Sequence, residues 1–160
     1  MSRIGHIIKE IAFSGSTSGF VSTFGKKRAS ETELSEFMQV DGGLLEFWRT
    51  AESAELFKDK THGQWGLKIL TPEASRSLTQ VELIERPGEM LPTDLVFAEF
   101  FGDSDQLIME FAFERADQKP IYVKLPLDRR YDWPKVADSF EEFLETVSYT
   151  HLTLPTNREV

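Results

Sequence analysis

The 160-residue sequence contains no cysteine, which excludes disulfide scaffolds, thiol nucleophiles and zinc sites built on thiolates. No apolar run approaches the roughly 20 residues that a membrane-spanning helix needs. The N-terminal stretch MSRIGHIIKEIAF is interrupted by His6, Lys9 and Glu10, so it lacks the continuous apolar core of a secretory signal. We therefore expect a cytoplasmic protein that does not contact a membrane.

Basic residues are scarce, because 18 Lys and Arg stand against 27 Asp and Glu, for a net charge of −9. Phosphate contacts need concentrated Lys and Arg, so this balance argues against direct nucleic-acid binding. The excess is uneven: residues 1–88 carry 11 basic and 12 acidic side chains, whereas residues 89–147 carry 6 and 14, net −8. The acidic half is either an ordinary soluble surface or a surface that steers a basic partner.

The apolar residues suffice for one core, since 40% of the chain is hydrophobic and 13 residues are Phe. Apolar spacing predicts helices over 3–13, 31–41, 44–57 and 136–147, the last with Pro134 near its first turn. Ser30 and Glu33 fit a capping box at the start of the second helix. Alternation and turn residues predict strands over 65–70, 77–85, 94–101, 106–113 and 120–125.

The last three strands follow one another with short polar turns at 102–105 and 115–119, which is typical of an antiparallel meander. The helix over 136–147 has an apolar stripe that can cover one face of this sheet. The sequence therefore predicts an α+β fold, with N-terminal helices, an antiparallel β meander and a C-terminal helix packed on the sheet. We divide the chain into an N-terminal helix and loop over 1–29, a domain over 30–147 and a tail over 148–160.

Two segments resemble nucleotide-binding or catalytic motifs, and neither matches its motif. Residues 19–26 (GFVSTFGK) place five residues between glycines where a phosphate-binding P-loop has four, and Lys27 stands where the magnesium-binding hydroxyl belongs. Residues 15–19 (GSTSG) carry Thr17 at the nucleophile position of a G-x-S-x-G elbow, and no strand precedes them. We interpret 14–25 as a loop.

Metal and cofactor sites find no support either. His6 and Glu10 offer two ligands, which rarely suffice. Asp103 and Asp105 begin like a calcium loop, but the following residues continue as a strand. We expect no catalytic residue, no metal and no cofactor.

The tail over 148–160 (SYTHLTLPTNREV) resembles translated sequencing-adaptor sequence found on many unrelated predicted proteins. We therefore expect that it is not native and does not belong to the fold.

Three segments carry a family resemblance: 91–103 (LPTDLVFAEFFGD), 120–123 (PIYV) and 136–144 (VADSFEEFL). Their order, a strand ending at a Gly-Asp turn, a second strand and a closing helix, resembles the SMI1/KNR4 superfamily, also called SUKH. The resemblance covers residues 30–147 and is best over Ala137 to Leu144. Two departures are a faint match at 41–43 to the family's N-terminal segment, and Phe97 to Phe101 in place of its Trp-rich strand.

The resemblance implies a non-enzymatic protein-binding domain that, like many bacterial members, acts as an immunity protein and neutralises a cognate toxin by binding it. Toxins in such systems are often nucleases with basic surfaces, which the acidic half of this chain would complement. We expect the partner-binding residues to be Asp94, Glu99, Asp103, Asp105 and Glu110. Two alternatives stay open: a regulatory or scaffold interaction module of the same fold, and a small-ligand-binding enzyme that uses the 14–25 loop. The sequence does not indicate an oligomeric state.

Overall fold

A computed structural model describes residues 3–13, 20–37, 39–59, 61, 66–102, 105–110 and 119–153. Within these residues the α-helices are α1 (Arg3–Phe13), α2 (Glu31–Leu34), α3 (Gly42–Thr50), α4 (Pro72–Glu85) and α5 (Phe140–Thr153). Two short 3₁₀ helices are η1 (Ser35–Phe37) and η2 (Arg130–Asp132). The strands are β1 (Phe20–Phe24), β2 (Ala54–Asp59), β3 (Leu67–Ile69), β4 (Asp94–Phe100), β5 (Gln106–Glu110), β6 (Ile121–Lys124) and β7 (Lys135–Ala137).

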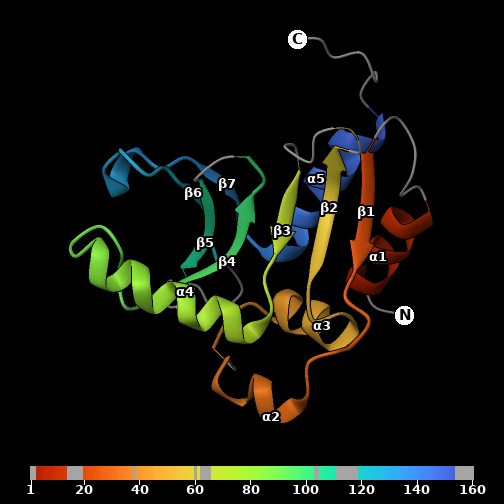
Figure 1. Cartoon of the computed structure of the whole chain (residues 1–160), viewed down its shortest axis with the longest axis horizontal. Helices are drawn as coiled ribbons and strands as arrows, with labels where there is room; N and C mark the ends of the chain where they lie inside the picture. The colour runs from red at the N-terminus through yellow and green to blue at the C-terminus, as the bar shows by residue number, and fades with distance from the viewer. Residues whose placement is uncertain are drawn as a thin grey trace.

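The described strands form one seven-stranded sheet whose order in space is the order in the sequence. Every neighbouring pair is antiparallel. The predicted meander is therefore confirmed, and it extends over the whole sheet. The predicted α+β class with a C-terminal helix on the sheet is also confirmed (Figure 1).

One face of the sheet is covered by α1, α3 and α5. In Figure 1, α5 lies behind the strands, α1 lies at the right beside β1, and α3 lies below them. α1 contributes Ile4, Ile7, Ile8 and Ile11, whose helical spacing places all four on its buried side. In α5, Phe140 and Phe143 meet the ring of Phe97 on β4 edge to face, with centroids 5.7 and 5.9 Å apart. α1 and β1, residues 3–13 and 20–24, therefore share this core with α3, β4 and α5.

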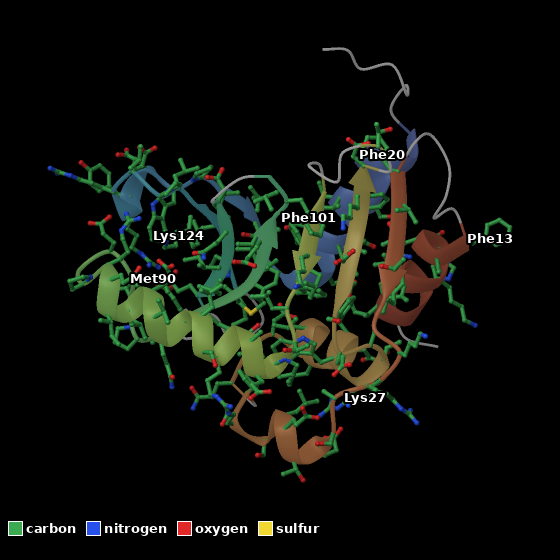
Figure 2. The ribbon with its side chains drawn as sticks, in the orientation of Figure 1. Phe13, Phe20, Lys27, Met90, Phe101 and Lys124 are labelled. Carbon is green, nitrogen blue, oxygen red and sulfur yellow. The ribbon has the colours of Figure 1, made fainter. Side chains whose placement is uncertain are left out.

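The opposite face is covered by α4 over β4, β5 and β6. The buried cluster beneath α4 consists of Leu70, Met90, Val96, Ile108 and Trp133. Lys124 on β6 and Glu82 on α4 form an ion pair in this layer, with Nζ and Oε1 2.8 Å apart and side chains only 4% and 14% exposed. Figure 2 shows Lys124 and Met90 in the same lobe, above α4.

The segment 77–85 is helical, so the predicted strand is wrong. Thr71 caps α4 by accepting from the Ala74 amide, and Pro72 begins the helix instead of ending a strand. The outward side of α4 carries Val81 and Ile84, which are exposed. These two apolar residues on the solvent side hide the helical period from sequence reasoning.

Two predicted helices are shorter than expected. The capping box of Ser30 and Glu33 is confirmed, but α2 ends at Leu34 and continues only as η1. α3 ends at Thr50, and residues 54–57 of the predicted 44–57 helix belong to β2. Residues 20–24 of the expected 14–25 loop form β1, while 14–19 lie outside the described residues.

The C-terminal helix begins later than predicted. Residues 135–137 form β7 and pair with β6, so Pro134 precedes a strand and α5 begins at Phe140. α5 continues through Thr153, past the start of the predicted tail at 148, and 154–160 lie outside the described residues. The predicted strand residues 111–113 and turn residues 115–118 also lie outside them. Leu125, the last residue of the predicted 120–125 strand, follows β6 and packs on the α4 side.

Candidate partner-binding site

The five acidic residues expected to bind a partner do not form one site. Asp94 begins β4 and Glu99 lies near its end, about 17 Å away at strand rise. Asp94 pairs with Glu110 across the β4–β5 ladder, whereas Glu99 pairs with Gln106. One end of the ladder therefore holds Asp94 and Glu110, and the other holds Glu99 together with Asp105. Asp103 lies outside the described residues.

Asp94 is buried and forms hydrogen bonds within the fold. It is 1% exposed, and its carboxylate accepts from the Leu91 amide and from both terminal nitrogens of Arg130. The Arg130 Nη2–Asp94 Oδ1 distance is 2.9 Å. As a correction to the expectation above, Asp94 does not contribute to an exposed acidic surface, because its charge is already neutralised by a bidentate partner.

Glu99 lies in a row of polar side chains that crosses the sheet. Lys68 stands opposite Glu99 on β3, with Glu55 beyond Lys68 on β2. On the other side Gln106 stands opposite Glu99 and Lys124 opposite Gln106. Charges of opposite sign therefore neighbour each other, which stabilises the sheet and balances Glu99 locally. Asp105 is half-buried beside this row.

Arg130, a residue that sequence reasoning missed, organises the other end of the ladder. Besides binding Asp94, its Nη1 donates to the Glu89 carbonyl at 3.0 Å, and its backbone amide donates to the Glu89 carboxylate. Its Nη2 lies 3.8 Å from Oε2 of Glu110. Burial lowers the pKa of Arg130, but the Asp94 hydrogen bond and the charges of Asp94 and Glu110 outweigh it, so the net pKa is raised. Arg130 is a fixed cation that joins β4, β5 and the 86–90 turn.

Trp133 packs beside Arg130 among three cations. The charged groups of Arg130, Arg86 and Lys124 lie 5.5, 5.9 and 6.0 Å from its ring centroid. Its indole N–H donates to the Asp128 carbonyl at 3.1 Å, so the ring is buried with its polar atom satisfied. Cation–π attraction at a buried ring is worth about 1–2 kcal/mol per contact, which holds the 125–134 loop against the sheet.

Arg86 fixes the same loop from α4. Its guanidinium donates to the carbonyls of Pro126 and Asp128 at 2.7 and 2.8 Å. These two bonds flank Leu127, whose side chain is 94% exposed. The loop is therefore held by its backbone, while its apolar side chain points to solvent.

A hollow of about 500 Å³ opens beside Arg130. Its lining consists of Gly88, Glu89, Tyr122, Arg130, Tyr131 and Trp133. The pKa of Tyr122 is raised by burial first and then by the charge of Glu110, with Arg130 opposing. At neutral pH its phenol is therefore a hydrogen-bond donor. The hollow offers aromatic faces, one carboxylate and hydrogen-bond donors, groups suited to binding a polar side chain.

Three large apolar side chains are exposed at this end of the molecule: Ile84, Leu127 and Tyr131, at 79%, 94% and 78%. They come from the end of α4 and from the loop after β6, which lie together at the left in Figure 1. Phe13, 95% exposed, lies at the opposite side of the molecule and points away from it in Figure 2. We name Ile84, Leu127, Tyr131 and the hollow the end surface.

A signal for the end surface exists in the sequence, but it is weak. Residues 128–133 (DRRYDW) place arginines between acidic and aromatic residues, a composition typical of interaction sites. The sequence led us to expect no site over 86–89 or 126–133. What it could not supply is that these two segments meet through Arg86, Arg130 and Glu89.

The candidate motifs rejected from the sequence can now be placed. β1 supplies residues 20–24 of the 14–25 segment, and the element before it is the helix α1, so the described part of this segment lacks the strand–loop–helix order of a P-loop. His6 pairs with Glu10 at 3.4 Å on the exposed side of α1. Over the described ranges, no three His, Asp or Glu side chains gather where they could hold a metal ion. None of the helices in this part of the chain is long and apolar enough to cross a membrane.

Comparison with known proteins adds no family: no protein-family model matches the sequence, and no curated protein matches it. The SMI1/KNR4 resemblance therefore rests on the segments 91–103, 120–123 and 136–144 alone.

Proposed function

We propose that this chain is a non-enzymatic protein-binding domain that acts as an immunity protein, neutralising a toxin by direct binding. The resemblance over 91–147 supports the toxin assignment. The observation that carries the protein-binding part is the end surface, where three exposed apolar side chains project from a backbone that Arg86 and Arg130 hold in place.

The energetics favour a protein partner. Burying an apolar side chain of this size contributes about 1.5–3 kcal/mol. Because hydrogen bonds and ring contacts already fix the loop, little backbone freedom is lost on binding, and more of this gain becomes affinity. Exposed aromatic residues beside arginine are also the residue types that dominate binding energy at interfaces.

The charge around the end surface favours a basic partner. Glu85, Asp128 and Asp132 are exposed at its rim, with Arg129 as an exposed basic residue between the two aspartates. Such an acidic rim speeds encounter with a basic surface and makes the association rate sensitive to salt. This rim replaces Asp94 as the location of the steering charge that the acidic half of the sequence predicts.

Co-expression tests the proposal. The flanks of this gene in its native genome are sequenced first. A toxin domain encoded there is then expressed with the wild type, with an Ile84→Ser/Tyr131→Ala variant, and with Phe13→Ser as a matched control for an exposed apolar residue elsewhere. We expect survival with the wild type and the control, and killing with the double variant. Killing in all three cultures contradicts the immunity function.

The regulatory or scaffold module is distinguished by the same variants. A scaffold would bind its partner through the end surface, yet it would leave the enzymatic activity of that partner unchanged. Measuring toxin activity at saturating protein therefore separates the two: inhibition supports neutralisation, and binding without inhibition supports the scaffold.

A further inference from the structure

We propose that the hollow beside Arg130 accepts a lysine or arginine side chain of the protein partner. The inference rests on the proposed protein-binding function and adds the residue type that is recognised. It follows from the volume of the hollow, the charges around it, and the fact that Tyr131 is the one ring in its lining over which no cation of the described residues lies.

The hollow has the size of a ligand site. Its volume of about 500 Å³ lies within the range of about 300–1,000 Å³ found for ligand pockets. It opens next to Tyr131, which is 78% exposed, so a side chain from a surface seated on the end surface can enter it.

The charges favour a cation. Arg130 is surrounded by Glu89, Asp94 and Glu110, and Asp94 binds both of its terminal nitrogens. An incoming group therefore meets a neutralised guanidinium and the carboxylate of Glu89, which is 30% exposed. The carboxylate of Glu110, 23% exposed, is not part of the lining, but it lies 3.8 Å from Nη2 of Arg130 and adds negative charge nearby.

The net charge of the wider cluster of ion pairs around Arg130 is also negative. It consists of three basic residues, Arg86, Lys124 and Arg130, and four acidic residues, Glu82, Glu89, Asp94 and Glu110. Three positive and four negative charges leave a net charge of −1, which an incoming ammonium or guanidinium would cancel. A phosphate or carboxylate would add to the excess and would compete with Asp94 for the donors of Arg130.

Tyr131 supplies the remaining contact. The rings of Tyr122 and Trp133 already lie near Arg130, at 5.9 and 5.5 Å from its guanidinium carbon. Among the described residues no cation lies over the ring of Tyr131. A partner's Lys or Arg over this face would gain a cation–π contact, which at exposed sites changes affinity about two- to fivefold.

The test is an NMR titration of the full chain with three blocked pentapeptides, Gly-Gly-X-Gly-Gly, in which X is Arg, Lys or Glu. We expect the Arg and Lys peptides to shift the Trp133 indole signal and the backbone signals of Gly88 and Tyr131, more weakly at higher salt. The Glu peptide should leave these signals in place. Equal or larger shifts with the Glu peptide, or no shifts at these residues with millimolar Arg peptide, overturn the proposal.

Matched variants separate the contacts. Tyr131→Ala should lower the affinity for the Arg peptide by about two- to fivefold, whereas Tyr131→Phe, which keeps the ring, should not lower it. Glu110→Gln should weaken it by a similar factor of about two to five, and Phe13→Ala should have no effect. Unchanged affinity in both Tyr131→Ala and Glu110→Gln overturns the assignment. If the Arg peptide binds but the wild type does not protect cells in the co-expression test, the immunity function is contradicted while the cation site is supported.

Discussion

Gly66 lies against the backbone of Phe57, so closely that a Cβ at position 66 would be 2.5 Å from the Phe57 carbonyl oxygen and 2.4 Å from that of Leu56. Both residues have left-handed backbone, with φ of +102° at Gly66 and +56° at Phe57. Phe57 is the one non-glycine residue with positive φ in the described part of the chain. The β1–β2 register shifts here, between Val21 and Thr23, which marks a β-bulge.

Replacing Gly66 by alanine should destabilise the fold by about 2–5 kcal/mol, because it combines left-handed strain with a backbone clash. Two other glycines separate these effects. Gly88 has φ of +87° and open space, so Gly88→Ala should cost only the strain, about 1–2 kcal/mol. Gly42 has neither constraint, and Gly42→Ala should stay within about 1 kcal/mol of the wild type. Urea unfolding ranks the three, and equal costs at 66 and 88 would contradict the clash.

β2 was predicted as the end of a helix because Phe57 continues the helical spacing of Leu44, Leu45, Trp48 and Ala51; the bulge is what lets Phe57 be buried on a strand instead. Regular alternation would place Leu56 and Phe57 on opposite faces of the strand. The bulge turns both side chains into the core, where they are 0% and 5% exposed. The residue with left-handed backbone in this bulge is Phe57, and phenylalanine is not a residue type from which a bulge can be predicted in a sequence.

The buried Glu82–Lys124 pair should show strong coupling. The side chain of Lys124 is only 4% exposed, and Glu82→Leu removes the carboxylate that pairs with its ammonium. This substitution should lower the free energy of unfolding by about 2–4 kcal/mol. Adding Lys124→Met removes the stranded charge and should recover most of that loss, since an apolar pair of similar size replaces a buried ion pair at little cost. A double-mutant cycle by urea unfolding measures the coupling. Additive effects of the two substitutions would contradict a pair that is buried and mutually dependent.

Stability should fall at alkaline pH through Tyr122. Its pKa is raised above the ordinary value of 10.0 in the folded chain, by burial first and then by Glu110. The folded state therefore holds the phenolic proton more tightly than the unfolded state, so stability is lost as pH rises from about 10 through the folded pKa. The difference between wild type and Tyr122→Phe in urea unfolding at several pH values isolates this contribution. A difference that does not change above pH 10 would contradict the raised pKa.

The fold was more predictable than the site, for a physical reason. Local patterns identify elements: the isoleucines of α1, the Ser30 capping box, and the alternation of Leu107 and Met109 in β5. The site depends on contacts between distant segments, such as Arg130 with Glu89 and Asp94. In the sequence Asp94 is one acidic residue among many, and only its 1% exposure and its bond to Arg130 show that it is internal.

That internal bond gives the sharpest test of the charge argument. Asp94→Asn should remove the carboxylate that neutralises Arg130 and cost about 2–4 kcal/mol of stability, less than for a fully buried pair because Arg130 is 21% exposed. It also raises the net charge of the cluster from −1 to 0 and leaves a charged guanidinium at the hollow. The preference for the Arg peptide over the Glu peptide in the NMR titration should therefore decrease. The affinity for the Arg peptide should fall by about two- to fivefold, and the Glu peptide should begin to shift the Trp133 and Tyr131 signals. A folded Asp94→Asn protein that still favours the Arg peptide as strongly as the wild type does would mean that Arg130 is not what the ligand senses, and that Glu110 and the Tyr131 ring alone set the preference.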